Sequence, residues 1–275
     1  MNSLEAAMRV LRLADQSRPV LRVGEVSREL GLQKSTVSRL LRTMSEHELI
    51  ERERSGQGYV AGRRALVLAD LYLSAHTLLD LVDSAVNALV GEFEFVGYVA
   101  ALSGADIVVL RVKHGRYPLR LVQEVGKRIP ATSTALGLAL LARKSDAEAL
   151  ELVRADTDAH AEPSLLAGRL DEIRSEGMAS ISGAIIPGIA AIGAAVGEPG
   201  GNEALGFALS YPVSAADDRL TARMAVRVRE EGLRIGTRLG DPAWTALDPG
   251  ARIIEMRSLQ PSRQRRAPRA RKATG

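Results

Sequence analysis

Apolar residues recur at helical spacing in three short stretches near the N-terminus, residues 4–14, 23–30 and 35–47. The first pattern stops at Ser17-Arg18-Pro19, and Gly31 follows the second pattern, where a helix C-terminus favours a left-handed residue. The third stretch has cationic and hydroxyl-bearing faces and one apolar face, formed by Val37, Leu40, Leu41 and Met44. The sequence therefore predicts three helices, of which the third is half buried.

A short hairpin and a long helix are predicted next. Residues 49–54 alternate in polarity, residues 55–58 (Ser-Gly-Gln-Gly) favour a turn, and residues 59–61 can return as a second strand. Residues 64–90 are rich in Leu, Ala and Val at helical spacing and contain neither Gly nor Pro. We expect one linker helix over this range, with His76 as a candidate break.

The remaining pattern predicts a second, larger domain over residues 91–245. Strands are expected at residues 93–102, 107–113, 178–182, 189–196 and 204–210. Helices that begin at a Ser or Asp cap are expected at residues 133–142, 146–155 and 164–176, and a long helix at residues 219–239 closes the domain. This order indicates an α+β fold in which helices cover an antiparallel sheet, preceded by a separate N-terminal domain at residues 1–63.

Charge is distributed unevenly along the chain. Residues 1–64 contain 12 Lys or Arg and 8 Asp or Glu, a net charge of +4. Residues 65–260 contain 19 and 25, a net of −6, and residues 261–275 contain 6 and none, a net of +6. Basic ends around an acidic middle are expected if the ends meet a polyanion such as nucleic acid. Residues 249–275 cannot form a core, so we expect a disordered basic tail there.

Composition narrows the function classes further. A chain of 275 residues, 46% of them hydrophobic, is long enough for two cores. It has no cysteine, which excludes disulfides, thiolate metal sites and cysteine nucleophiles. Charged residues interrupt the N-terminal segment, which has neither a signal peptide's apolar run nor the roughly 20 apolar residues of a membrane span. We therefore expect a soluble, cytoplasmic protein with no membrane partner.

Residues 23–47 match the helix-turn-helix arrangement, in which the second helix enters the major groove of DNA. The outer face of this helix offers contacts for bases and phosphates through Gln33, Lys34, Ser35, Thr36, Ser38, Arg39 and Arg42. The hairpin would form a wing, with Arg52 and Arg54 directed at phosphates. A pair of solvated helices with ordinary surface charges is the competing interpretation. The hairpin favours DNA binding, because three independent segments then satisfy one arrangement.

Several segments resemble transcription factors of the IclR (isocitrate lyase regulator) type. Residues 31–44 (GLQKSTVSRLLRTM) and 59–66 (YVAGRRAL) are similar to the family's N-terminal domain. Residues 129–142 are similar to the loop and helix beside the family's effector pocket. Three further segments are similar to the strands that line the family's pocket: residues 177–179, 187–196 and 205–212. The resemblance covers about residues 4–240, and the segments are specific when they are taken jointly.

The resemblance implies a winged helix-turn-helix joined by a helix to a GAF-like effector domain. It also implies dimers or tetramers that bind palindromic operators in double-stranded DNA and respond to a small metabolite, often an organic or aromatic acid. We therefore expect a homodimer or homotetramer that represses transcription. The sequence alone leaves the choice between repression and activation open.

By the same resemblance, the effector pocket is formed by Thr132, Ser133, Thr134, Ala135, Leu136, Gly137, Ser182, Ala191, Ala208 and Ser210. Backbone N–H groups and hydroxyls at the start of the predicted helix could hold a carboxylate or an amide, and the other walls are small or apolar. The chain departs from the family pattern at three places. Residues 180–186 lack the usual acidic residues, Leu138 replaces a Lys, and Ala191 replaces a frequent Cys. The identity of the effector is therefore open.

The sequence predicts no catalytic residue, no metal site and no cofactor. The histidines lie far apart in the sequence, and Ser133 and Thr134 are not part of a GxSxG motif. The glycines at residues 193–201 are not followed by the strand-to-helix transition of a phosphate-binding loop. Two other functions compete with a ligand-responsive regulator: an enzyme built on a sensor-like domain, and a DNA-binding scaffold that senses nothing.

Overall fold

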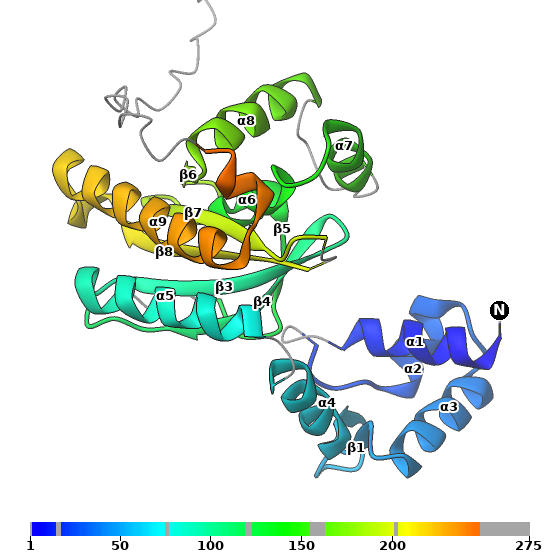
Figure 1. Ribbon diagram of the computed structural model, residues 1–275. Helices are drawn as coiled ribbons and strands as arrows, with labels where there is room; N and C mark the ends of the chain where they lie inside the picture. Colours follow the sequence, from blue (N-terminus) through cyan, green and yellow to red (C-terminus); the bar gives the residue numbers. More distant parts are fainter. Residues whose placement is uncertain are drawn as a thin grey trace, which may run out of the picture.

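The computed structural model describes residues 2–14, 18–74, 77–118, 123–154, 163–200 and 203–247. A small helical domain at the N-terminus is joined by helix α4 to a larger α+β domain (Figure 1). This architecture agrees with the fold class expected from the sequence. The basic tail expected at residues 249–275 lies outside the described residues.

The N-terminal domain consists of α1 (Ser3–Leu13), α2 (Val23–Leu30), α3 (Lys34–Glu46) and a hairpin of β1 (Ile50–Arg52) and β2 (Tyr59–Ala61). Gly31 ends α2 in the left-handed conformation, with φ 66°, which a residue with a Cβ adopts only at a cost. The hairpin is antiparallel, and Leu21 adds an isolated bridge to Tyr59. One core holds the domain together, built from Val10, Leu21, Val26, Val37, Leu41, Met44, Ile50 and Tyr59.

The linker expected at residues 64–90 consists of two helices, α4 (Arg63–Ser74) and α5 (Thr77–Phe93), which divide at the candidate break expected near residue 76. The two helices differ in burial, since α5 buries an apolar face in the second domain whereas α4 exposes most of its apolar residues. Within the described ranges, no single helix is long and apolar enough to cross a membrane, and only the bent pair α4 and α5 passes that test jointly. Tyr72 of α4 donates a hydrogen bond of 3.0 Å to Glu203 in the second domain.

The second domain contains a six-stranded antiparallel sheet with the order β5-β4-β3-β8-β7-β6. Its strands are β3 (Val96–Ser103), β4 (Asp106–Lys113), β5 (Arg128–Pro130), β6 (Ala179–Ser182), β7 (Ile189–Gly197) and β8 (Ala204–Pro212). The first strand begins later than residue 93, because α5 continues to Phe93 and Glu94 then turns the chain at φ 60°. The short edge strand β5 was not expected from the sequence.

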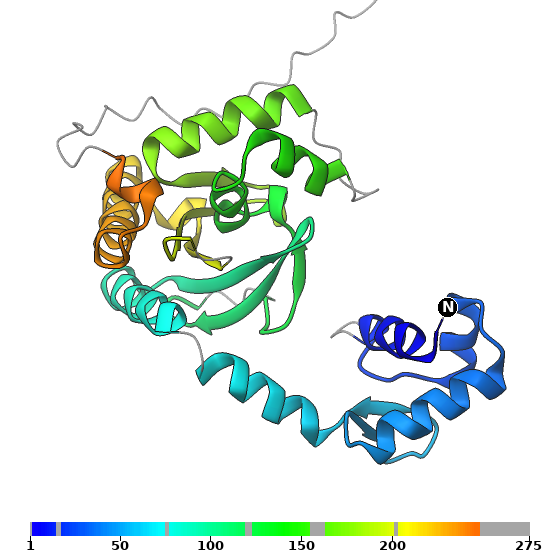
Figure 2. The same ribbon diagram turned by 45° about the vertical axis from the view of Figure 1, so that its right-hand side comes forward.

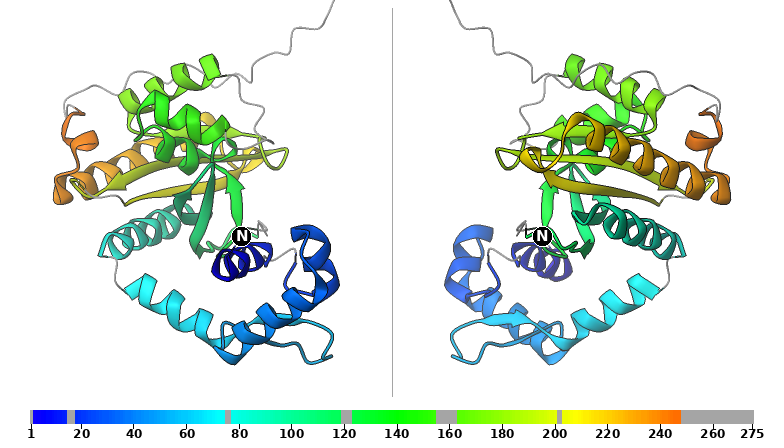
Figure 3. Two further views of the ribbon diagram at one scale, coloured as in Figure 1. Left: turned by 90° about the vertical axis from the view of Figure 1, so that its right-hand side faces the viewer. Right: turned by 90° about the vertical axis from the view of Figure 1, so that its left-hand side faces the viewer.

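Helices cover both faces of this sheet (Figures 2 and 3). α5 and α9 (Asp218–Leu239) pack on one face, against large side chains such as Phe207 and Leu209 of β8. α6 (Ala135–Leu141), α7 (Asp146–Arg154) and α8 (Pro163–Glu176) pack on the other, where the strands present smaller residues such as Ala195 and Ala208. Alternate residues of β8 therefore belong to two separate cores.

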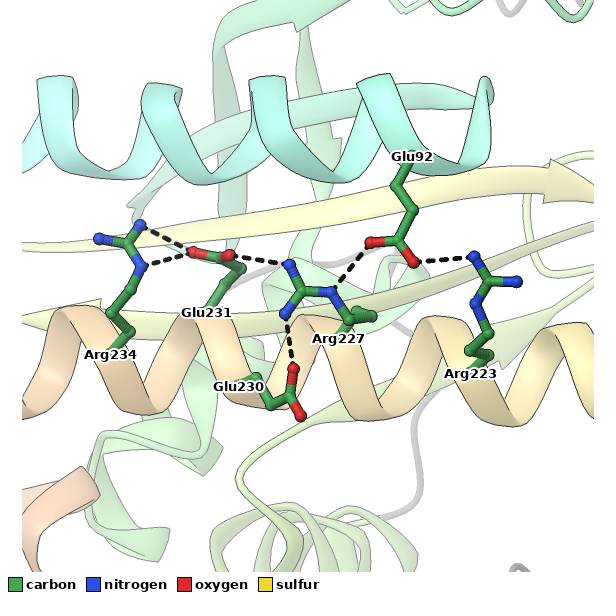
Figure 4. Close-up of polar contacts among 6 residues, drawn as sticks. All are labelled: Glu92, Arg223, Arg227, Glu230, Glu231 and Arg234. Carbon is green, nitrogen blue, oxygen red and sulfur yellow. Dashed lines mark hydrogen bonds and ion pairs between the residues drawn. The ribbon is translucent and has the colours of Figure 1, made fainter.

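α9 is held by a polar network on one side and by an aromatic contact at its C-terminal end. On the α5 side, Glu92 accepts hydrogen bonds of 2.9 Å from both Arg223 and Arg227, and the network extends along α9 through Glu230, Glu231 and Arg234 (Figure 4). At its C-terminal end, α9 is followed by the short helix α10 (Pro242–Thr245), which was also not expected. Trp244 of α10 is buried against α9 and donates a hydrogen bond of 2.9 Å to the carbonyl of Ala195.

Candidate DNA-binding surface and effector cavity

α3 presents a polar face to solvent because its apolar residues Val37, Leu41 and Met44 are buried in the N-terminal core. Among the nine residues expected to contact DNA, Thr36 is half-buried and the others are exposed: Gln33, Lys34, Ser35, Ser38, Arg39, Arg42, Arg52 and Arg54. Gln33 caps α3 without a side-chain hydrogen bond. Because the Gln33 side chain does not cap α3, the backbone N–H groups at the start of the helix can donate hydrogen bonds to an anion or to the edge of a base.

The cations of this surface differ in how far they are engaged within the protein. Arg42 forms an ion pair of 3.1 Å with Glu46 one turn later. Arg52 donates a 3.3 Å hydrogen bond to the carbonyl of Gly56, and its guanidinium lies 4.8 Å from the ring centre of Tyr59. In the part of the chain that the structure describes, Lys34 and Arg39 make no ion pair. These two side chains can therefore bind an external anion without losing an internal one.

A cavity of about 70 Å³ lies between the sheet and the start of α6. Seven of the ten residues expected at the effector pocket line it: Ser133, Thr134, Ala135, Leu136, Ala191, Ala208 and Ser210. Its other walls are mainly aliphatic and come from β4, β5 and residues 181–190: Ile107, Val109, Ile129, Ile181, Ala184, Ile185, Ile186, Ile189 and Ala190. Two further lining residues, Tyr98 and Gln123, were not expected from the sequence.

Three of the expected pocket residues do not line the cavity: Thr132, Gly137 and Ser182. Ser182 is exposed and follows Ile181, which does line the cavity, and successive side chains of a strand point to opposite faces. Gly137 has a packing role, because a Cβ there would lie 2.3 Å from the carbonyl oxygen of Ala131. Thr132 lies in a 3-10 turn over Ala131–Ser133, ahead of α6.

Thr134, and not Ser133, caps α6. The Thr134 hydroxyl accepts a hydrogen bond of 3.0 Å from the N–H of Gly137 and donates one of 3.3 Å to the carbonyl of Ala131. The sequence indicates Ser133 as the cap, but Ser133 is the last residue of the 3-10 turn. The residue with extended backbone directly before α6 is therefore Thr134. The hydroxyl of Thr134 is therefore occupied within the protein, whereas that of Ser133 is not needed as a cap.

Tyr98 and Gln123 are the cavity residues that sequence reasoning missed. Tyr98 is buried in the middle of β3, and its burial raises the pKa of its hydroxyl well above the usual value. Within the described ranges, neither the Tyr98 hydroxyl nor the Gln123 side-chain oxygen has a hydrogen-bond partner, although both atoms are buried. An unpaired buried polar atom is costly, so a structure usually provides a partner for it.

A second hollow, of about 640 Å³, opens beside Arg143, Arg174 and Trp244. Two of its three cations are already engaged, because Arg143 binds Asp241 and Arg174 binds the carbonyl oxygens of Ala142 and Lys144; the third is Lys144 itself. This hollow is therefore less suited to a ligand than the cavity beside α6. Across the described residues, no group of three His, Cys, Asp or Glu side chains could hold a metal ion.

Comparisons with known proteins relate both domains to regulators. Residues 3–54 match the family model of the IclR helix-turn-helix domain, and residues 70–237 match that of the bacterial transcriptional regulator IclR C-terminal domain. The chain is 24% identical over 247 residues to the HTH-type transcriptional regulator XynR of Escherichia coli, covering 88% of this chain and 98% of XynR. It is 32% identical over 209 residues to the glycerol operon regulatory protein of Streptomyces coelicolor, covering 70% and 78% of the two chains.

Solved structures show the same fold. A crystal structure of an IclR-type regulator from a Silicibacter species superposes with a TM-score of 0.78 at 19% identity, covering 88% of this chain and 99% of the other. An IclR homologue from Microbacterium hydrocarbonoxydans, solved in complex with 4-hydroxybenzoate, superposes with a TM-score of 0.70 at 20% identity, covering 87% and 99%.

Proposed function

Since the chain belongs to the IclR family of transcriptional regulators, which are not enzymes, we propose that it is a repressor whose binding to a palindromic operator is controlled by a small organic molecule. The observation that carries this proposal is the presence, in one chain, of a helix whose exposed face has two cations without an ion pair among the described residues, and a mostly apolar cavity in a second domain. With DNA as its partner, the protein would act in the cytoplasm on this proposal.

On this proposal, α3 enters the major groove with its N-terminal end foremost. Lys34 and Arg39 are the strongest candidates for contacts with guanine or phosphate, since neither is engaged with a carboxylate within the described ranges. Gln33, Ser35, Thr36 and Ser38 are neutral and would add shorter contacts with bases. Arg42, Arg52 and Arg54 would bind phosphates and so position the domain without selecting a sequence.

The second domain would hold the effector in the cavity beside α6. Aliphatic walls favour a largely apolar ligand with one polar group. The cavity of about 70 Å³ is small, since sites for drug-sized ligands occupy roughly 300–1,000 Å³. A compact molecule, such as one substituted ring or a short branched chain, therefore fits best. The homologue that binds 4-hydroxybenzoate supports a ligand of this size in this fold.

A palindromic operator requires a two-fold symmetric protein. α4 exposes four large apolar residues, Leu66, Val67, Leu68 and Leu71, which are 49–73% exposed in the single chain. A patch of this kind favours association with another protein surface. We propose that α4 pairs with the same helix of a second copy, so that the DNA-binding unit is a homodimer or a tetramer built from two such dimers.

Gel-shift titration of the Arg39→Ala and Lys34→Ala variants on DNA from the promoter of the protein's own gene tests the DNA-binding part. Loss of a base contact should weaken binding by about 1–3 kcal/mol, whereas loss of a phosphate contact should weaken binding to all sequences and lower the salt dependence. Arg238→Ala removes the same charge from the exposed face of α9 and serves as the control. Unchanged affinity of both α3 variants would contradict the proposal.

A further inference from the structure

Tyr98 and Gln123 are the two lining residues of the cavity beside α6 whose side chains carry buried, unpaired polar atoms in the described part of the chain. Tyr98 is 5% exposed and is surrounded by the core that packs under α6. Its hydroxyl and the side-chain oxygen of Gln123 are both buried without a hydrogen-bond partner in the part of the chain that the structure describes. Both residues line the cavity. A bound molecule is therefore in a position to supply the missing partners.

The described lining of the cavity contains no charged side chain. Its polar members are Tyr98, Gln123, Ser133, Thr134 and Ser210, and the Thr134 hydroxyl is already used to cap α6. An ion that enters such a site loses its hydration and gains no opposite charge, which disfavours the charged form of a ligand. A neutral group has a much smaller desolvation penalty.

The uncommitted groups also have a chemical character in common. A tyrosine hydroxyl, a serine hydroxyl and a glutamine amide can each donate and accept a hydrogen bond. They can therefore pair with a ligand group that both donates and accepts, such as an amide or a hydroxyl. A carboxylate only accepts, and it would leave the acceptor oxygen of Gln123 unpaired unless the amide turned around.

We propose that this uncharged lining, with the uncommitted polar groups of Tyr98 and Gln123, selects an uncharged effector, with an amide or hydroxyl group on a compact apolar body, over the carboxylate of the same shape. This inference rests on the proposed function, because it specifies the class of molecule that the sensor domain recognises. It also departs from the aromatic acid that the family resemblance implies.

Direct binding to the full-length protein tests the inference without DNA. Two pairs of probes have matched shapes and differ in charge at neutral pH: benzamide with benzoate, and isobutyramide with isobutyrate. By isothermal titration calorimetry we expect the amide of at least one pair to bind about tenfold or more tightly than its carboxylate. Equal or tighter binding of the carboxylates would overturn the inference, and so would failure of both amides to bind.

Removal of single hydroxyls tests whether Tyr98 contributes to this selectivity. In the Tyr98→Phe variant, affinity for the amide should fall about tenfold, while the melting temperature without ligand stays equal or rises, because an unpaired buried hydroxyl is removed. The control is Tyr211→Phe on the same sheet, whose hydroxyl is bonded to Thr221. This variant should lose stability and keep its affinity. A Tyr98→Phe variant that melts earlier and binds the amide normally would show a structural role only and would overturn the inference.

Calorimetry and the gel shift together distinguish failure of the proposed regulatory function from failure of this inference about charge. If the amide binds with the expected preference but does not change operator binding in a gel shift, the cavity recognises an uncharged molecule and the regulatory coupling is wrong. If operator binding responds to a carboxylate that also binds more tightly in calorimetry, the regulatory proposal stands and the inference about charge fails.

Discussion

Arg143 and Asp241 form a two-point ion pair between elements that are 98 residues apart in the sequence. The guanidinium nitrogens of Arg143 lie 2.8 and 2.9 Å from the two carboxylate oxygens of Asp241, which is fully buried. Asp241 also accepts hydrogen bonds from the N–H groups of Gly197 and Ala243. The pair joins the C-terminal end of α6, whose other end borders the cavity, to the chain that follows α9.

Replacement of Asp241 by Ala should strongly destabilise the second domain. The change leaves the Arg143 charge in a largely buried position and two N–H groups without an acceptor, so we expect a loss of about 3–5 kcal/mol in the free energy of unfolding. Urea denaturation monitored by circular dichroism measures it. In the control, Glu46→Gln breaks the exposed pair with Arg42, which should cost at most about 1 kcal/mol. Equal effects of the two changes would contradict this prediction.

Gly236 should not tolerate a methyl group, because Trp244 packs directly on it. A Cβ at Gly236 would lie 2.4 Å from the ring atom Cγ of Trp244. We expect Gly236→Ala to displace the indole and to destabilise the protein by about 1–3 kcal/mol. Trp244 is the only tryptophan of the chain, so the displacement is measurable as a red shift of its fluorescence.

The matched control for this change is Gly91→Ala in α5, where nothing lies within 4 Å of the added Cβ. There the substitution should stabilise the protein by about 0.4–1 kcal/mol, because it reduces the entropy of the unfolded chain. Unshifted fluorescence in Gly236→Ala would show that the packing of Trp244 on α9 is looser than the structure indicates.

Sequence periodicity located the N-terminal domain closely. α2 was expected at its observed ends because Gly31 marks its C-terminus, and α1 and α3 begin and end within one residue of their expected bounds. Short elements were missed, since the three residues of β5 and the four of α10 are too few to produce a period. The candidate break near residue 76 does separate α4 from α5, but the different burial of the two helices could not be predicted, because it depends on which apolar face the second domain buries.

The cavity was predicted only in part, for a related reason. Residues 133–136 form one loop and were found by resemblance, whereas Tyr98 and Gln123 reach the same cavity from β3 and from the chain before β5. A tyrosine in an apolar strand is usually a core residue, and a glutamine outside any periodic segment has no pattern to distinguish it. Only the strand order, which places β3 between β4 and β8, brings these residues together.

The pKa of Glu92 is lowered, mainly by its hydrogen bond with Arg223 and also by Arg227. A carboxylate with a lowered pKa stabilises the folded state above its unfolded pKa of about 4.3, and this contribution is lost as the pH falls through the folded value. Glu92→Gln should therefore destabilise the protein at pH 7 by about 1 kcal/mol or less, because the network is partly exposed.

The difference between wild type and Glu92→Gln should shrink as the pH falls below about 4.3. Thermal denaturation at a series of pH values measures this trend. Glu151→Gln in α7, which removes an exposed carboxylate without an ion-pair partner in the described ranges, should show no such dependence. A constant difference at all pH values would mean that the carboxylate charge of Glu92 does not stabilise the contact between α5 and α9.

Charge on the apolar patch of α4 should dissociate the proposed dimer. Leu68→Glu combined with Leu71→Glu places carboxylates on one side of the helix, at positions that are 53% and 59% exposed in the single chain. Analytical ultracentrifugation should show a shift toward monomer and footprinting a loss of operator protection. Leu165→Glu, at a position of α8 that is 70% exposed, should change neither. An unchanged sedimentation coefficient in the α4 variant would exclude this helix as the interface.

Filling the cavity should separate effector response from DNA binding. Ala208 lines the cavity from β8, is 2% exposed, and faces the core under α6, so a phenyl ring at this position must occupy the space of a ligand. We expect Ala208→Phe to abolish binding of whichever of benzamide and benzoate binds the wild type. Affinity for the operator without ligand should be retained, because α3 and the hairpin fold around their own core.

Overpacking can itself cost about 1–3 kcal/mol, so a milder substitution is needed beside Ala208→Phe. Ala191→Leu fills the same cavity from β7, where the side chain is only half-buried and its neighbours have more freedom to adjust. Both variants should fold, bind operator DNA and fail to respond to the ligand in a gel shift. If both bind the ligand with normal affinity, the effector site lies elsewhere, and the hollow beside Arg143 and Trp244 becomes the next candidate.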